Sequence, residues 1–410
     1  MARFTPLRER HESLGASFTD FGGWQMPVRY TSDLAEHHAV RRAAGLFDIS
    51  HMAEFTVDGP DAAAYLDHAL AGRISAVAVG RAKYSLVLAE SGGIVDDVIV
   101  YRLGKESFLI ISNAGNRDAV AHALQERTRF DSPAARSTSE GGADRSTSEG
   151  GADRSTSEGG ADRSTSEGGA DRSTSEGGVT VVDVSDDYAL LAVQGPAAET
   201  ILAETDGITE VSIPWAEQRY YAWASARFRG EPLLIARTGY TGEDGFELLV
   251  RAADATALWD AVLAAGEPHG LVPAGLAARD TLRLEAGMPL YGHELTLDTK
   301  PAQAGLGRVV AADKDDFVGR DAVQPASDAR VLVGLAAEGR RAGRSGYAVV
   351  SEDGSVVGEI TSGALSPTLG HPIAMAYIDP AAREQPLFLD VRGTRIPATL
   401  TDMPFYRRTR

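Results

Sequence analysis

The sequence KYSLVLAESGGIVDDVIVYRL, residues 83–103, contains two apolar stretches separated by a Ser-Gly-Gly sequence. Branched and aromatic side chains are typical of β-strands, and serine and glycine are typical of turns. These residues therefore predict a β-hairpin. Its second strand carries two acids, Asp96 and Asp97, where the pattern is otherwise apolar.

The segments on either side of this hairpin mix strands with helices. Residues 106–113, ESFLIISN, predict a further strand, and residues 231–252, EPLLIARTGYTGEDGFELLVRA, predict a second hairpin with a glycine-rich loop. After about residue 325 the pattern changes to short strands separated by Gly and Pro, which predicts an all-β C-terminal domain. No regular alternation of strand and helix is present, so the sequence predicts an α+β fold.

Three helices are predicted from their terminal residues. Asp33 and Glu36 form a capping-box pair that opens a helix through HHAVRRAAG, and Gly45 is its expected end. Asp254 is the expected N-cap of the helix DATALWDAVLAAG. Gly287 is the expected end of the helix GLAARDTLRLEAG.

A low-complexity repeat interrupts the middle of the chain. From residue 136 to residue 178 the unit RSTSEGGAD occurs four times and is followed by RSTSEGG. A unit without large apolar residues buries too little surface to offset the ordering of its backbone, which costs about 1–2 kcal/mol per residue. Calcium-binding β-roll repeats need regularly placed apolar residues, which this unit lacks. We predict that residues 136–178 form a disordered insertion.

Composition restricts the class of protein. The 410 residues carry a formal net charge of −18 and contain no cysteine. An acidic surface repels nucleic-acid phosphates and anionic lipid, so we expect neither nucleic acid nor a membrane as a partner. The absence of cysteine excludes disulfides, thiolate metal sites and cysteine nucleophiles. With neither a signal-peptide pattern nor an apolar run of about 18 residues, the chain is expected to be cytoplasmic.

The acid pair permits two interpretations. Neighbouring strand residues point to opposite faces, so Asp96 and Asp97 are not expected to serve one purpose. A buried, unpaired carboxylate is costly and must be offset by partners or by function. Either one acid is functional, or both hydrogen-bond the turn or pair with arginines, and the residues alone leave both possibilities open.

Glu247 and Arg279 are further candidates for a binding site. Glu247 follows the glycine-rich loop, and an acid there could accept two N–H donors of a heterocycle, although the loop also fits a plain hairpin. Arg279 and Arg283 are four residues apart and share a helical face. Such a pair could clamp a carboxylate, but surface ion pairs with Asp280 or Glu285 are the commoner arrangement.

The histidines do not predict a metal site. None of the nine shows the spacing of known metal ligands. We therefore expect His51 and His293 to be structural. Ser50 precedes His51, but the partners of a catalytic triad meet in space rather than in sequence.

Eight motifs in a fixed order resemble the T-protein family of the glycine cleavage system. The resemblance covers the chain except for the repeat, and the combination of motifs is far more specific than any one of them. The motifs are LFDISHMAEF, GGIVDDVIVY, ISNAGNRD, LLAVQGP, RTGYTGEDGFEL, GLAARDTLRLEAGMPLYGHEL, ITSGALSPTLG and the terminal MPFYRR.

This resemblance implies both a fold and a reaction. The fold is a three-domain, cloverleaf-like folate-binding ring. Two interleaved α+β domains are expected in residues 1–325, and a β-barrel in residues 326–410. The implied enzyme is an aminomethyltransferase that takes the aminomethyl group from the lipoyl arm of H-protein. Tetrahydrofolate accepts the carbon, and the products are 5,10-methylene-tetrahydrofolate, ammonia and dihydrolipoyl H-protein.

The resemblance also assigns roles to individual residues. Asp97 matches the essential aspartate beside the reactive folate nitrogens, and Glu247 matches the acid that binds the pterin edge. The other residues implied to line or bind the folate channel are Tyr240, Met52, Tyr84, Tyr101 and Arg279. Arg407 or Arg408 is expected to face the glutamyl tail. No metal is implied.

Two other functions fit the same superfamily. One is a folate-dependent demethylase, which dependence on lipoyl H-protein would distinguish. The other is a non-catalytic folate-binding protein, whose relatives carry a cysteine-bearing motif that this chain lacks. For the aminomethyltransferase, the expected partners are lipoylated H-protein, docked on an exposed basic patch, and the other glycine cleavage proteins.

We predict that deletion of residues 136–178 leaves activity and melting temperature unchanged. The entropic cost of a longer loop grows only with the logarithm of its length, so the insertion costs about 1–2 kcal/mol. Thermal unfolding and an activity assay of the deleted and full chains check this. Loss of either property in the deleted chain contradicts it.

Overall fold

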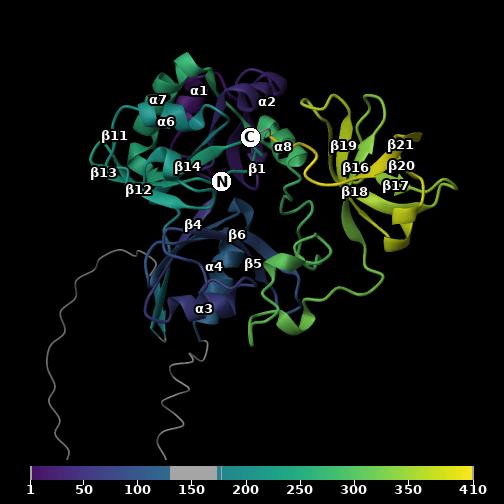
Figure 1. The fold of residues 1–410 in the computed structure, drawn as a ribbon, viewed down its shortest axis with the longest axis horizontal. Helices are drawn as coiled ribbons and strands as arrows, with labels where there is room; N and C mark the ends of the chain where they lie inside the picture. Colours follow the sequence, from purple (N-terminus) through teal and green to yellow (C-terminus); the bar gives the residue numbers. More distant parts are fainter. Residues whose placement is uncertain (1, 130–172, 177, 409–410) are drawn as a thin grey trace, which may run out of the picture.

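A computed structural model describes residues 2–129, 173–176 and 178–408. It contains a seven-stranded sheet, a six-stranded sheet and a closed barrel, with helices packed on the two sheets (Figure 1). A short hairpin of β1 (Ser17–Phe21) and β2 (Trp24–Arg29) lies apart from these sheets. The predicted α+β fold with a C-terminal β-barrel is confirmed.

The seven-stranded sheet contains the Glu247 strand. Its order is β11 (Ile208–Thr209), β12 (Trp223–Phe228), β13 (Glu231–Ala236), β14 (Gly245–Arg251), β10 (Tyr188–Gln194), β3 (Ala44–Asp48) and β15 (Leu271–Pro273). All neighbours are antiparallel except β3 and β15. The predicted hairpin of residues 231–252 is present as β13 and β14.

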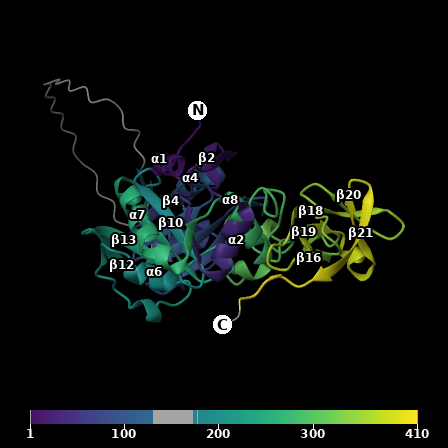
Figure 2. The ribbon, with the colours of Figure 1, turned by 90° about the horizontal axis from the view of Figure 1, so that it is seen from above.

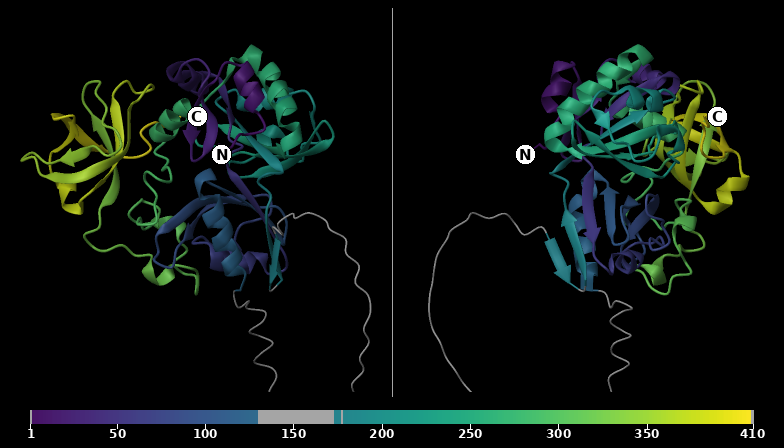
Figure 3. Two further views of the ribbon diagram at one scale, coloured as in Figure 1. Left: turned by 180° about the vertical axis from the view of Figure 1, so that it is seen from behind. Right: turned by 60° about the vertical axis from the view of Figure 1, so that its left-hand side comes forward.

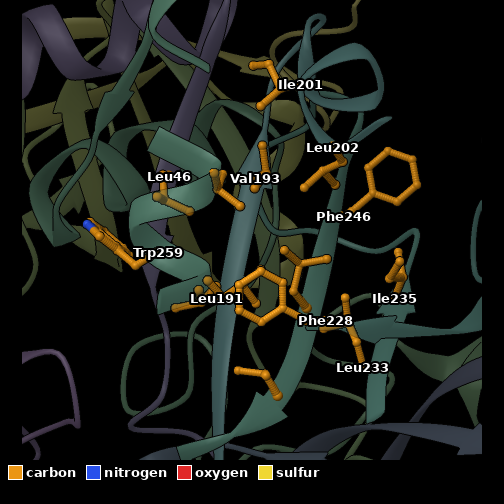
Figure 4. Close-up of a cluster of buried hydrophobic side chains, with 14 of the residues drawn as sticks. Leu46, Leu191, Val193, Ile201, Leu202, Phe228, Leu233, Ile235, Phe246 and Trp259 are labelled. Carbon is orange, nitrogen blue, oxygen red and sulfur yellow. The ribbon is translucent and has the colours of Figure 1, made fainter. Parts of the chain in front are cut away.

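Helices cover both faces of this sheet. α6 (Ala198–Glu204) and α7 (Ala255–Gly266) pack on one face, where Trp259 and Phe246 belong to a buried apolar core (Figure 4). α2 (Asp33–Arg42) and α8 (Leu276–Glu285) contribute to a second cluster, which also contains Tyr101 from the six-stranded sheet. The remaining helix of this region is α1 (Arg8–Ser13).

The six-stranded sheet contains the acid pair. Its order is β5 (Ala82–Leu88), β6 (Ile94–Arg102), β7 (Ser107–Ser112), β4 (Ala53–Asp58), β9 (Val179–Asp183) and β8 (Ser173–Glu176). The predicted hairpin of residues 83–103 is β5 and β6. α3 (Ala62–Ala69) and α4 (Arg117–Glu126) cover one face and share its apolar core.

The C-terminal barrel closes without a free edge. Its strands are β16 (Val331–Ala337), β19 (Pro372–Ile378), β18 (Val356–Leu365), β17 (Ala348–Val350), β20 (Leu387–Val391) and β21 (Thr394–Thr401). Both Figure 1 and Figure 2 show it beside the two sheets, with α8 toward it. A barrel needs alternating apolar residues on its inner face, which the short strands after residue 325 supply.

The chain passes between the two sheets twice. It forms β3 in the larger sheet, then β4 to β9 in the smaller sheet, and returns to the larger sheet at β10. Residues 286–330, between α8 and β16, run beside the six-stranded sheet before the barrel begins (Figure 3). The exact domain boundaries at residues 325 and 326 stay a prediction.

Short 3-10 helices occupy several connections. They are η1 (Ala114–Asn116), η2 (Arg127–Arg129), η3 (Trp215–Glu217), η4 (Ala252–Asp254), η5 (Glu267–His269), η6 (Gly307–Val309), η7 (Arg320–Ala322) and η8 (Pro380–Glu384). Within the described ranges, no helix is both long and apolar enough to span a bilayer.

The predicted helix ends need two corrections. The N-cap of α2 is Ser32, whose hydroxyl accepts a hydrogen bond from the backbone N–H of Ala35, and not Asp33. The Glu36 carboxylate instead accepts backbone N–H groups from outside the helix, including that of Gly275. Gly45 does not end the helix, because the chain enters strand β3 already at Ala44.

The other two helix ends lie where expected. Asp254 is the N-cap residue of α7, although its side chain makes no capping bond and pairs with Arg251. Gly287 follows α8 with a φ of 64°, and the backbone bonds from Gly287 and Met288 back to Leu284 and Arg283 complete a Schellman motif. Glycine is needed there because its φ is positive.

The predicted disorder of residues 136–178 lies mostly outside the described residues. Its last part is wrong, because Ser173–Glu176 form β8 and pair antiparallel with β9. Backbone pairing at a sheet edge requires free N–H and C=O groups but no apolar side chain. An argument from side-chain burial therefore missed this strand.

Candidate functional site

Asp96 and Asp97 lie where strand β6 extends beyond its neighbour β7. The pairing of β6 with β7 begins at Ile99, so residues 94–98 have no strand partner on that side. Asn113 follows the end of β7, and its side-chain amide nitrogen lies 2.8 Å from Oδ1 of Asp96 and 2.8 Å from Oδ1 of Asp97. The two hydrogens of one NH₂ group therefore serve both carboxyls.

This arrangement corrects one expectation from the strand pattern. The two acids were expected to have no common purpose because they start on opposite faces. They nevertheless share the Asn113 amide, since the missing stretch of β7 leaves room for a side chain to reach both. Neither acid has a hydrogen bond or ion pair with an arginine among the described residues.

Asp96 is enclosed by the segment that follows β7. It is fully buried and also accepts the backbone N–H of Asn113 at 2.9 Å and Nδ2 of Asn116 at 2.6 Å. Burial, together with the charge of Asp97, raises the pKa of Asp96 to about 7. Asp96 thus holds the Asn113–Asn116 segment after β7, and not the hairpin turn or an arginine, which were the structural partners expected for the pair.

Asp97 faces a group of tyrosines. The Tyr84 hydroxyl donates to Oδ2 of Asp97 at 3.1 Å. Burial raises the pKa of Asp97, while the hydrogen bonds from Tyr84 and Asn113 lower it. Burial raises the pKa of Tyr221 and Tyr240, and the negative charge of Asp97 adds to both shifts. The Asp97 carboxyl is therefore held by neutral donors in an aromatic setting.

Glu247 and Arg279 form the other part of the site. Glu247 lies on β14 and accepts hydrogen bonds from the Thr238 hydroxyl at 2.5 Å and the Tyr101 hydroxyl at 3.4 Å. Arg279, on α8, places its guanidinium carbon 4.7 Å from the ring centre of Tyr240. Its Nη1 is buried without a hydrogen-bond partner among the described residues.

Burial shifts both of these charged groups toward their neutral forms. It raises the pKa of Glu247 and lowers the pKa of Arg279, and the attraction between the two opposes both shifts. A buried guanidinium N–H without a partner is costly, so the site is suited to a ligand that supplies an acceptor. Glu247 is suited to N–H donors of the same ligand.

The structure brings most of the predicted residues together between the two sheets. Tyr101 of β6 touches Glu247 of β14, and Met52 packs on the same cluster as Tyr101. The ring of Tyr240 packs against the guanidinium of Arg279, and the charge of Asp97 acts on the Tyr240 phenol. Arg407 is exposed outside this group, while Nη1 of Arg408 lies 3.5 Å from Oδ1 of Asp244.

Arg283 does not join Arg279 in a clamp. It is buried and paired with Asp280 at 2.7 Å and with Glu294 at 3.0 Å. The expected ion pair with Asp280 is therefore present, and the pair with Glu294, which is fully buried, was not predicted. Arg279, at the other position of the same helical face, keeps its unpaired N–H group.

Sequence reasoning missed Asn113 and gave His51 only a structural role. Asn113 directly after β7 and Asn116 three residues later are a usable signal, because their amides can satisfy acids on the neighbouring strand. His51 is buried with no partner for Nδ1 among the described residues, and its charge would be repelled by Arg279. Burial lowers the pKa of His51 to about 4, so its ring is neutral at pH 7.

No group of three or more metal-ligating side chains is present in the described part of the chain.

Comparisons with known proteins show the family of the chain. The model of the GCVT N-terminal domain matches residues 7–143 and 157–314, and that of the glycine cleavage T-protein C-terminal barrel domain matches residues 330–407. The aminomethyltransferase of Cutibacterium acnes is 50% identical over 99% of both chains. That of Saccharopolyspora erythraea is 46% identical over 99% of this chain and 98% of its own.

A solved structure shows the same fold. The glycine cleavage system aminomethyltransferase T from Bartonella henselae matches 99% of this chain and 98% of its own, with a TM-score of 0.79 and 32% identity. The chain therefore belongs to the glycine cleavage T-protein family. Within this family its activity is that of an aminomethyltransferase, as the motifs predicted.

The raised pKa of Asp96 predicts a pH dependence of stability. An acid with a raised pKa in the folded state stabilises the fold below its unfolded value, near 4, and this contribution is lost as pH rises to about 7. Relative to wild type, the Asp96→Asn variant should therefore gain on the order of a few kcal/mol of unfolding free energy between pH 4 and pH 7. Urea unfolding at several pH values measures this difference. The exposed Asp118→Asn variant is the control, and its difference in unfolding free energy from wild type should not change with pH. A difference for Asp96→Asn that is equally independent of pH contradicts the assignment.

Proposed function

We propose that this enzyme transfers the aminomethyl carbon from the lipoyl arm of H-protein to tetrahydrofolate. In the balanced reaction the carbon loses its bonds to the lipoyl sulfur and to the amine nitrogen and gains two bonds to folate nitrogens. The two folate N–H protons pass to the released ammonia and to the sulfur, which leaves a dithiol. The partly buried Asp97 carboxyl, held by Tyr84 and Asn113, and the buried Nη1 of Arg279, which has no hydrogen-bond partner among the described residues, are the observations that support this proposal.

Glu247, Arg279 and Tyr240 are proposed to hold tetrahydrofolate, which supplies the two nitrogens that accept the carbon. Glu247 accepts N–H donors of the heterocycle, and the free N–H of Arg279 donates to an acceptor on the ligand. Tyr240 is fixed by a hydrogen bond from its hydroxyl to the Pro289 carbonyl, so its ring forms a firm wall. Met52 and Tyr101 are proposed to line the same folate site.

Asp97 is proposed to act on the reacting atoms. A carboxylate in an apolar, aromatic setting stabilises positive charge more strongly than the same group in water. Asp97 therefore favours the positive charge that develops as ammonia leaves, and it orients the attacking N–H group. Tyr84 and Asn113 hold the carboxyl in place while they leave its overall charge unchanged.

The chain end is proposed to bind the folate tail. Tyr406 is anchored by its backbone N–H, which donates to the Glu285 carbonyl at 2.8 Å, and its ring lies 4.1 Å from the guanidinium carbon of Arg41. Arg407 follows this anchor and is exposed, and we propose that it meets the glutamyl carboxylates. We further propose that the enzyme works in the cytoplasm with the other glycine cleavage proteins.

Asp97→Asn tests the catalytic role. The substitution keeps the shape of the side chain but removes its charge, so we expect kcat to fall by about 10²–10⁴-fold with little change in the Kd of tetrahydrofolate. Ammonia release from aminomethyl-loaded H-protein measures kcat. The exposed Asp58→Asn substitution is the matched control. A variant at Asp97 as fast as wild type would remove this role.

Glu247→Gln tests the binding role. Loss of the charged acceptor should raise the Kd of tetrahydrofolate by roughly 10–100-fold, because hydrogen bonds to charged groups contribute about 1.5–3 kcal/mol. Titration calorimetry of the purified protein measures Kd directly. Glu231→Gln, on the neighbouring strand β13, should bind as wild type does. Equal affinities for all three proteins would assign Glu247 a structural role.

A further inference from the structure

The guanidinium of Arg41, near the end of α2, is buried where the glycine-rich loop meets α8. The Arg41 side chain is only 5% exposed. Its Nη1 donates to the Thr241 carbonyl at 2.8 Å and to Oε1 of Glu243 at 2.9 Å, and both residues belong to the loop between β13 and β14. Its Nη2 donates to Oε2 of Glu285, the last residue of α8, at 2.7 Å. One side chain therefore joins the loop to the helix.

The barrel and the chain end contact the same guanidinium. Nε of Arg41 donates to the Thr368 hydroxyl at 3.3 Å, and Thr368 lies in the barrel between β18 and β19. The ring of Tyr406 covers the guanidinium carbon at 4.1 Å. Figures 1 and 3 show the chain end returning from the barrel to α8. A planar guanidinium with five N–H donors can serve all of these neighbours, whereas a lysine ammonium has three donors on one atom.

The loop and the helix that Arg41 joins carry the residues proposed to hold folate. Tyr240 lies in the loop, and Glu247 lies on β14 directly after it. Arg279 lies on α8, less than two turns before the helix ends. The distance between loop and helix therefore sets how far Tyr240 and Glu247 lie from Arg279. A ligand held from both sides loses affinity when its partners are no longer held in place.

Loss of this guanidinium would affect the loop more than the helix. Glu285 would keep the Ser366 hydroxyl and both the backbone N–H and the hydroxyl of Thr368 as donors. Among the described residues, Glu243 has an ion pair with Arg41 alone and would keep only the hydrogen bond from the Tyr406 phenol. A buried carboxylate without a cation is costly, so we expect Glu243 to turn toward solvent and to displace the loop.

We infer that Arg41 is a positioning residue for tetrahydrofolate, which holds Tyr240 and Glu247 at a fixed distance from Arg279. This inference rests on the proposed function. Each of the three side-chain nitrogens of Arg41 already has a protein acceptor, so the residue acts through the loop and the helix rather than by contact with the ligand. It therefore determines the affinity for folate and leaves the chemistry at Asp97 largely unchanged.

Arg41→Lys and Arg41→Met test the inference by titration calorimetry with tetrahydrofolate. Lysine keeps the charge without the planar fork, and methionine keeps only an apolar stem. We expect the Kd to rise at least ~10-fold in both variants, while kcat for ammonia release at saturating folate stays within about 3-fold of wild type. Arg42→Met, at the exposed next position of α2, is the matched control and should bind as wild type does. An unchanged Kd in both Arg41 variants would overturn the inference.

A double-mutant cycle separates positioning from a general loss of stability. If Arg41 acts by placing Glu247, Arg41→Met should weaken binding much less in an enzyme that already carries Glu247→Gln. Equal losses in both backgrounds would assign Arg41 a general structural role and overturn the inference. Glu243→Gln keeps Arg41 in place and removes only the ion pair to the loop, so it should raise the Kd by about 3-fold even if the Arg41 variants fail to fold. An unchanged Kd in Glu243→Gln would also overturn the inference. A wild-type enzyme that does not bind tetrahydrofolate would instead contradict the proposed function.

Discussion

The NH₂ group of Asn113, shared between Asp96 and Asp97, is the contact on which the site depends. It satisfies one buried and one partly buried acid with one neutral amide, where an arginine would have neutralised their charge. Neutral donors leave the cost of burial largely in place, so the pKa of each carboxyl stays raised. The contact exists only because β6 continues past the end of β7. The early end of β7 thus determines which groups contact Asp96 and Asp97 on the longer strand β6.

The path of the chain then places the ligand pocket opposite these acids. Strand β14 supplies Glu247 and α8 supplies Arg279, while β6 supplies Asp97 from the other sheet. The barrel fixes α8, because the buried Glu285 accepts hydrogen bonds from the Ser366 hydroxyl and the Thr368 backbone N–H. Against the effect of burial, His37 and the hydroxyls of Ser366 and Thr368 lower the pKa of Glu285 to about 2, so the carboxylate stays charged and the contact stays intact near neutral pH. All three parts of the fold therefore contribute to one site.

Much of this was predictable from the sequence, and the exceptions have physical causes. Both hairpins, the α+β class, the barrel and the end of α8 at Gly287 follow from local patterns. The Ser32 cap was missed because Asp33 is an equally good capping residue by type. The role of Asn113 depends on how far β7 extends, and strand ends are set by tertiary pairing rather than by residue type. The burial of Arg283 depends on its pair with Glu294, a contact between segments that no spacing on α8 reveals.

Single-turnover ammonia release tests most directly the claim that both substrates react at Asp97. Aminomethyl-loaded H-protein is mixed with excess wild-type enzyme, with and without tetrahydrofolate, and ammonia and 5,10-methylene-tetrahydrofolate are followed together. The account predicts fast, equal formation of both products with folate and only slow ammonia release without it, because Asp97 assists a transfer that needs the acceptor in place. Ammonia release that is equally fast without folate, or that precedes the folate product, would contradict it.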